Sequence, residues 1–158
     1  MKTPIFRLIT IIFTVMALWA CDAKRVFDQY KEIPETSWHK DSVTVFNIPV
    51  DDTISYHNLL VQIRNETNYR FSNLWLFIEI VQPDGITLTD TFEVVLADPA
   101  GRWFGSGFGG LKTYQAIYQR HVRFPVKGEF KVAMWHGMRE EYLQGIHDIG
   151  FRVEKISE

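Results

Sequence analysis

Apolar and polar positions alternate along most of the chain, in short stretches separated by turn residues. Residues 59–64, 86–96 and 130–134 place apolar side chains at every second position, which is the period of a half-buried strand. Residues 43–48 are rich in β-branched side chains, which favours a further strand. Residues 74–81 are apolar on both faces except at one glutamate, as in a central strand covered on both sides.

Turn chemistry separates these stretches. Pro83-Asp84-Gly85, Asp98-Pro99-Ala100-Gly101 and Lys127-Gly128-Glu129 combine residues that preset or permit turn geometry. Residues 122–126 and 151–153 read as two more short strands. Residues 111–120 fit either an amphipathic helix or a strand that carries Tyr114, Ala116 and Tyr118 on one face.

Seven or eight short strands without a strong long helix predict an all-β fold. We expect a single antiparallel β-sandwich, similar to a jelly roll, with no internal repeat and no second domain. About 137 residues follow the N-terminal apolar run, which suits one domain with an adequate core.

The N-terminus has the order of a secretory signal. Lys2 and Arg7 precede an uncharged, largely apolar run over residues 8–18, the layout of an n-region and an h-region. The run ends in Leu18-Trp19-Ala20-Cys21, which resembles the lipobox of bacterial lipoproteins and implies cleavage before Cys21 and lipidation of its thiol. An uncleaved membrane helix is the alternative, but the run is shorter than the roughly 20 residues that a full span needs.

These features predict three segments. Residues 1–20 are expected to be the lipoprotein signal peptide, residues 21–37 the lipidated N-terminus and a tether, and residues 38–158 the β-sandwich domain. Three fatty chains on one residue exceed the two signals needed for stable membrane attachment. We therefore expect a membrane-bound protein held by its N-terminal lipid.

Composition narrows the classes of function. Removal of residues 1–20 takes away two of the 17 basic side chains and none of the 19 acidic ones, leaving 15 against 19 and a formal charge of −4. Nucleic-acid binding would need a basic face, so we expect no nucleic-acid partner. Cys21 is the only cysteine, and its lipidation would leave no thiol for disulfides, zinc or nucleophilic catalysis.

A glycine-aromatic stretch over residues 101–110 is the leading candidate for a contact site. Its side chains Arg102, Trp103, Phe104 and Phe108 could supply a large contact area, since exposed aromatic residues are costly to leave in water. A flexible loop whose glycines allow positive φ is the plainer alternative. Gly105-x-Gly107-x-x-Gly110 formally matches the dinucleotide fingerprint, but that motif works only between a strand and a helix.

Catalytic and metal-binding patterns are weak. The five histidines form no zinc-binding spacing, and Ser106 lacks the nucleophile elbow. Asp84, Asp90 and Asp98 could supply a carboxylate pair, although two of them sit in turns. Asp90 interrupts an apolar strand face, so we expect Arg64 or Arg123 to pair with it. We predict no enzyme activity, no metal and no cofactor.

Several blocks together resemble the gliding-motility lipoprotein GldH family of Bacteroidetes. Each block is short, but their order and spacing cover nearly all of the chain after the signal. They include Trp38-x-x-Asp41-Ser42, Ile63-Arg64-Asn65, Pro83-Asp84-Gly85, Leu96-Ala97-Asp98-Pro99-Ala100-Gly101-Arg102-Trp103, Gly105-Ser106-Gly107-Phe108-Gly109 and Gly145-Ile146-x-Asp148-Ile149-Gly150.

The resemblance implies an accessory lipoprotein of gliding motility, tied to type IX secretion and the cell envelope, with no catalytic residue to transfer. The first hypothesis is therefore a non-enzymatic, lipid-anchored interaction module whose partners are envelope proteins. The second is a glycan-binding or carbohydrate-active envelope lipoprotein, which a flat aromatic platform would favour. Asp22-Ala23-Lys24-Arg25 lacks the acidic run associated with surface export, so we expect an outer-membrane anchor that faces the periplasm.

Overall fold

A computed structural model of the chain describes residues 24–156. Ten strands and one short 3-10 turn (η1, Pro34–Thr36) follow one another along these residues. The strands are β1 (Arg25–Glu32), β2 (Ser37–His39), β3 (Thr44–Val50), β4 (His57–Glu66), β5 (Asn73–Val81), β6 (Thr87–Val95), β7 (Leu111–Val122), β8 (Gly128–His136), β9 (Tyr142–Gln144) and β10 (Ile146–Lys155). No helix among the described residues is long and apolar enough to cross a membrane.

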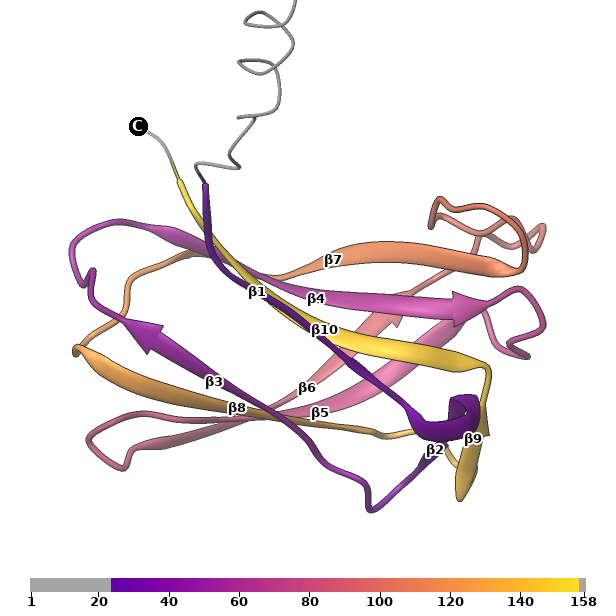
Figure 1. Ribbon diagram of the computed structural model, residues 1–158, viewed down its shortest axis with the longest axis horizontal. Helices are drawn as coiled ribbons and strands as arrows, with labels where there is room; N and C mark the ends of the chain where they lie inside the picture. The colour runs from indigo at the N-terminus through magenta and orange to yellow at the C-terminus, as the bar shows by residue number, and fades with distance from the viewer. Residues whose placement is uncertain (1–23, 157–158) are drawn as a thin grey trace, which may run out of the picture.

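Two four-stranded sheets face each other and form a sandwich (Figure 1). One sheet has the strand order β1-β10-β4-β7, and the other has the order β3-β8-β5-β6. Every pair of neighbouring strands is antiparallel. A small ribbon of β2 and β9 lies at one end. The predicted all-β sandwich is confirmed.

The core lies between the two sheets and takes its side chains from alternate positions of each strand. Because neighbouring side chains on a strand point to opposite faces, one face of each strand supplies the apolar layer. Fully burying one such side chain stabilises the fold by roughly 1.5–3 kcal/mol. The buried set includes Val61 and Ile63 of β4, Leu74, Leu76 and Ile78 of β5, Met134 of β8 and Phe151 of β10.

Residues 111–122 form a strand, which decides between the two sequence-based alternatives. β7 is the edge strand next to β4, and Tyr114 and Ala116 stand opposite Ile63 and Val61. Tyr114, Ala116 and Tyr118 all pack against the core, as the strand alternative predicts. The helix alternative is wrong.

The predicted tether is partly wrong because β1 belongs to the sandwich. Its eight residues pair with β10 at the edge of a sheet, where Arg25 stands opposite Glu154 and Glu32 opposite Asp148. Phe27 packs edge-on against Phe46 of β3, with ring centroids 6.4 Å apart. The sandwich therefore begins at residue 25, and the mixed charge of β1 reflects its edge position.

Residues 122–126 are expected in a strand, but β7 ends at Val122, and residues 123–127 connect it to β8. Pro125 lacks the N–H that a strand ladder needs, and His121, one residue before the end of β7, has a φ of 54°. Phe124 is nevertheless buried, with its ring 5.0 Å from that of Phe130. The apolar pattern therefore indicates burial correctly but not strand structure.

Within residues 24–156, Asp90 has no arginine partner of the kind expected. Its Oδ2 accepts a hydrogen bond from the Tyr118 hydroxyl at 3.2 Å, and its Oδ1 accepts one from the Thr91 N–H at 2.7 Å. The side chain is exposed because β6 is an edge strand at the open side of the sandwich. The Tyr118 hydroxyl, on the facing edge strand β7, therefore provides the side-chain partner for Asp90 that was expected from an arginine.

The sandwich has two different ends. At the terminal end, which comprises Lys24, residues 51–56, residues 120–123 and Lys155, the Lys155 N–H donates to the Lys24 carbonyl at 2.8 Å. At the loop end, residues 67–72, residues 101–110 and the β2–β9 ribbon meet (Figure 1). The ten residues of β4 run from one end to the other, which separates the ends by about 30 Å.

Candidate functional site

An aspartate builds the entry to the glycine-aromatic loop. Asp98 Oδ1 accepts hydrogen bonds from the backbone N–H groups of Ala100 and Arg102 at 2.9 and 2.8 Å. Its Oδ2 accepts one from the Arg102 Nε–H at 2.7 Å. The backbone bond from Arg102, reinforced by its guanidinium, holds the pKa of Asp98 below its usual range. The turn is therefore held by an ionised aspartate, and Gly101 completes it with a φ of 79°.

The loop is pinned to the ends of two strands. The Phe104 N–H donates to the Leu96 carbonyl at 2.9 Å, and Ser106 exchanges two backbone hydrogen bonds with Thr113 at 3.0 and 2.8 Å. A Cβ atom on Gly105 would lie 2.9 Å from the Thr113 carbonyl oxygen. Glycine at this position therefore allows close backbone approach, and the strand β7 that follows gives the dinucleotide fingerprint no helix.

The three aromatic side chains of the loop have different surroundings. Trp103 is half-buried and packs against the core, with its ring 6.4 Å from that of Tyr69. Phe104 is 53% exposed and lies against Tyr114, and Phe108 is 100% exposed. Of the predicted contact residues, Phe108, Phe104 and Arg102 face solvent, whereas Trp103 fixes the loop to the core.

A hollow of about 430 Å³ lies beside Phe108. Its lining comes from the β4–β5 turn, from the end of the loop and from the start of β10, through Glu66, Thr67, Asn68, Phe108, Gly110, Leu111 and His147. His147 Nδ1 lies 2.8 Å from Asp148 Oδ2, and the same oxygen lies 3.5 Å from Arg64 Nη1. The contacts among Arg64, Asp148 and His147 form a polar wall, of which His147 lines the hollow next to the exposed phenyl ring.

The sequence did not reveal this polar wall. Arg64 and Asp148 are far apart along the chain and come together because they stand opposite each other in the β4–β10 pairing. Asp148 is buried, which fits a carboxylate that is engaged by the Arg64 guanidinium and by the His147 ring. Each residue lies in a block of the family resemblance, but only the strand register joins them.

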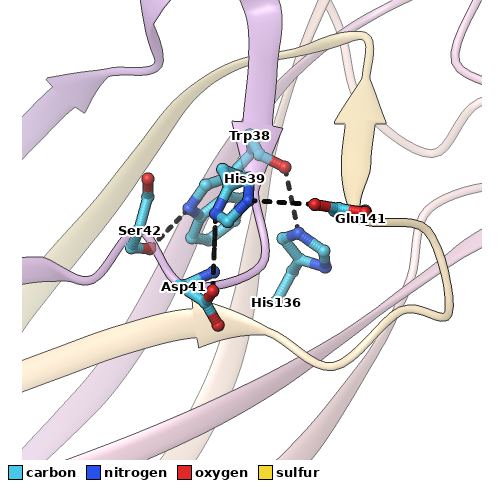
Figure 2. A network of polar contacts seen from close by, with 6 residues as sticks. All are labelled: Trp38, His39, Asp41, Ser42, His136 and Glu141. Carbon is cyan, nitrogen blue, oxygen red and sulfur yellow. Dashed lines mark hydrogen bonds and ion pairs between the residues drawn. The ribbon is translucent and has the colours of Figure 1, made fainter.

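The β2–β9 ribbon, at the same end of the sandwich as the loop, carries a second polar network (Figure 2). Trp38 Nε1 donates to the Ser42 carbonyl at 2.9 Å, and His136 Nε2 lies 3.0 Å from the Trp38 carbonyl oxygen. On the surface, His39 Nε2 lies 3.6 Å from Glu141 Oε1. Trp38 is 1% exposed and its ring lies 5.5 Å from that of His136. Trp38, held by these contacts, therefore covers the end of the core that lies beneath the ribbon.

Burial lowers the pKa of His136 below its usual value. The 3.0 Å contact places a proton on Nε2, since the Trp38 carbonyl can only accept. The neutral ring leaves Nδ1 buried, with no hydrogen-bond partner in the described part of the chain. Within residues 24–156, no group of three or more histidine, cysteine, aspartate or glutamate side chains is arranged to hold a metal ion.

The predicted site residues fall into two groups. Arg102, Trp103, Phe104 and Phe108 come together at the loop end of the sandwich. Cys21 and the predicted signal peptide lie outside the described residues.

Comparison with known proteins identifies the family. The family model described as GldH lipoprotein matches residues 25–153. The chain belongs to this family. A protein of Flavobacterium johnsoniae named gliding motility lipoprotein GldH is 41% identical over 152 residues, which cover 92% of this chain and 94% of that protein.

A protein of Christiangramia forsetii named gliding motility lipoprotein GldH homolog is 40% identical over 157 residues, covering 95% of this chain and 96% of its own length. Among solved structures, the infectious bursal disease virus Gx strain is similar with a TM-score of 0.41 and 14% identity, over 85% of this chain and 33% of that chain. A likeness at that level carries no argument about function.

Proposed function

We propose that the chain is a lipid-anchored, non-enzymatic accessory protein of gliding motility and type IX secretion that binds an envelope protein through its loop end. The observation that carries the proposal is Phe108, a fully exposed phenyl ring on a loop fixed by backbone hydrogen bonds. An exposed aromatic ring beside a hollow, on a loop held at its base, has the composition of a protein-binding hot spot.

Membership of a lipoprotein family supports the anchor at Cys21 and a place in the cell envelope. The name of the Flavobacterium johnsoniae relative supports a role in gliding motility. The absence of an acidic run after Cys21 in the sequence supports an outer-membrane anchor that faces the periplasm. In that arrangement the loop end, about 30 Å from the termini, is free to meet a partner.

The proposal is tested by separating binding from folding. Phe108→Ala is expected to lower partner binding by roughly 2 kcal/mol or more, while the melting temperature stays unchanged because the ring is fully exposed. Pull-down of native envelope partners and thermal melts measure the two effects.

Trp103→Ala is the matched variant, since the Trp103 ring packs against the core. It is expected to lower the melting temperature clearly. Unchanged partner binding by Phe108→Ala would contradict the contact role of the loop.

A second candidate function, glycan binding, is supported by an aromatic surface on the outer face of the β3-β8-β5-β6 sheet. Phe77 and Trp135 stand opposite each other with ring centroids 5.8 Å apart. Trp75, 38% exposed, lies next along β5 and lines a hollow of about 470 Å³ with Asn73 and Arg139. Such a surface presents flat rings beside hydrogen-bonding groups, as sugars require.

The two candidates make opposite predictions for one experiment. If glycans bind here, Trp75→Ala abolishes co-sedimentation with purified peptidoglycan or lipopolysaccharide, and Phe108→Ala does not. If the wild-type protein sediments with neither polymer, the glycan candidate is wrong and the protein-contact proposal is unaffected.

A further inference from the structure

A rigid turn at the terminal end presents an apolar side chain to solvent. Asp52 Oδ1 accepts hydrogen bonds from the backbone N–H groups of Ile54 and Ser55, each at 2.9 Å. The Lys155 ammonium donates to Asp52 Oδ2 at 2.8 Å, and this bond with the backbone bonds holds the pKa of Asp52 far below its usual range. Asp52 thus fixes the turn, and Ile54 is left 81% exposed.

The turn lies beside the point where the chain enters the sandwich. The Lys155 N–H donates to the Lys24 carbonyl, and the Ile156 N–H donates to the Tyr56 carbonyl, each at 2.8 Å. Lys24 lies three positions after Cys21, and a fully extended chain spans at most about 3.6 Å per residue. A lipid on Cys21 therefore attaches at a residue within about 11 Å of Lys24, at the terminal end.

Cationic side chains surround this turn. The Arg123 guanidinium lies 4.5 Å from the centroid of the Tyr56 ring, and the His121 ring lies 6.2 Å from it. Lys24, Arg25, Arg120, Arg123 and Lys155 are all exposed. Asp51 and Glu129 are exposed acids near this end, Asp52 is engaged by Lys155, and Arg25 stands opposite Glu154. Within residues 24–156, exposed cations therefore outnumber exposed acids at this end, although the whole chain has a formal charge of −2.

We infer that the terminal end is a membrane-seating surface that rests on the phosphate-bearing headgroups of the bilayer. Ile54 enters the boundary between headgroups and acyl chains, and Tyr56 lies at headgroup level, where amphipathic rings are favoured. Arg123 and its basic neighbours lie against lipid phosphates, each near-surface cation adding to the attraction. This inference rests on the proposed lipidation of Cys21 and adds an orientation, with the loop end directed away from the membrane.

The single cysteine makes the surface directly testable. Because Cys21 is consumed by the lipid, Ile54→Cys gives the full lipoprotein one free thiol, which is labelled with an environment-sensitive NBD fluorophore. The lipidated protein is reconstituted in vesicles of phosphatidylethanolamine and phosphatidylglycerol. We expect a blue-shifted emission at position 54 and its quenching by a lipid-attached nitroxide. The same label in Phe108→Cys, at the loop end, is expected to show neither.

The outcomes separate the seating surface from the anchor. If the labelled protein floats with the vesicles but position 54 emits as in water, the seating surface is wrong and the lipid anchor stands. If the protein stays in solution, the anchor is wrong and the seating surface falls with it. Arg123→Glu is expected to reduce the quenching at position 54 at least twofold, whereas Arg102→Glu at the loop end leaves it unchanged. Equal effects of the two reversals would overturn the role assigned to the cations.

Discussion

The two ends of this sandwich are built differently. The terminal end is made of short connections, exposed cations and one exposed isoleucine held by an aspartate turn. The loop end has the longest connection between strands, a glycine-aromatic loop fixed by backbone hydrogen bonds, and a ribbon whose tryptophan closes the core. Exposed apolar groups therefore occur at both ends, next to cations and the N-terminal entry of the chain at the terminal end, and next to a hollow at the loop end.

This difference shows that an exposed apolar side chain can be interpreted only together with the groups that surround it. An isoleucine among lysines and arginines, next to the N-terminus, suits a lipid surface. A phenyl ring beside a hollow lined by Glu66 and His147 suits a folded partner. The predictions below test this division, starting with the largest expected effect.

Cys21→Ala is expected to remove the protein from the membrane entirely. No helix of residues 24–156 could span the bilayer, and one isoleucine with a few cations gives only weak, reversible binding. Membrane fractionation with a radiolabelled fatty acid measures attachment and lipidation together. A mutant that is processed and survives a carbonate wash in the membrane pellet would show that another segment holds the protein.

Removal of one apolar side chain at each end is expected to affect stability very differently. Trp38→Ala removes a ring that is 1% exposed, so its expected cost is about 3–5 kcal/mol in the free energy of unfolding. Ile54→Ala is expected to stay within about 0.5 kcal/mol of the wild type, because the side chain contacts mainly solvent. Urea denaturation of the detergent-solubilised protein, followed by circular dichroism, checks both. A large loss from Ile54→Ala would show that the turn is part of the core.

Each end also contains a buried histidine, His57 at the terminal end and His136 at the loop end. Burial lowers the pKa of both below the usual value. As the pH falls through about 6.5, the unfolded chain therefore binds protons that the folded chain does not, and stability decreases until the lowered folded pKa values are reached. Urea denaturation at pH 7.5 and 5.5 is expected to show this loss of stability, which should be smaller than the loss caused by Trp38→Ala.

His136→Gln is expected to flatten the pH dependence, although it lowers stability at both pH values. His121→Gln, at an exposed position, is the matched control and should leave the dependence unchanged. Equal slopes for wild type and His136→Gln would mean that the histidine at the loop end does not contribute.

Most of the fold could be predicted from the local alternation of apolar and polar residues, because a half-buried strand shows this pattern wherever its partner strands lie. β4 and β8 were predictable in this way, and their inward residues contribute to the core. β5 was predicted from its apolar character on both faces, and its outer face leaves Trp75 38% exposed. β1 was not predictable, because an edge strand of mixed charge has little alternation, and its partner β10 lies over 110 residues further along the chain. Residues 123–126 gave the reverse error, since the buried Phe124 produces the apolar alternation of a strand in a connection.

The same limit applies to the candidate site: residues that are contiguous in the sequence could be located, whereas contacts between distant residues could not. The sequence located the loop over residues 101–110 from its glycines and rings, which are contiguous. It could not show that Trp103 would pack on Tyr69, 34 positions earlier, while Phe108 would stay exposed. The Arg64–Asp148 pair was equally invisible, because it depends on the register between β4 and β10.

The pairing of β1 with β10 also constrains the order in which the molecule is made. The N-terminal strand emerges first, yet its only neighbour within its sheet is the last strand of the chain. Closing so long a loop is slow, because its entropy cost comes before the contacts that repay it. A chain delivered from its N-terminus therefore has to wait, with one edge of its sheet missing, until residue 155 has arrived. Protection from proteases or aggregation is needed most during that interval.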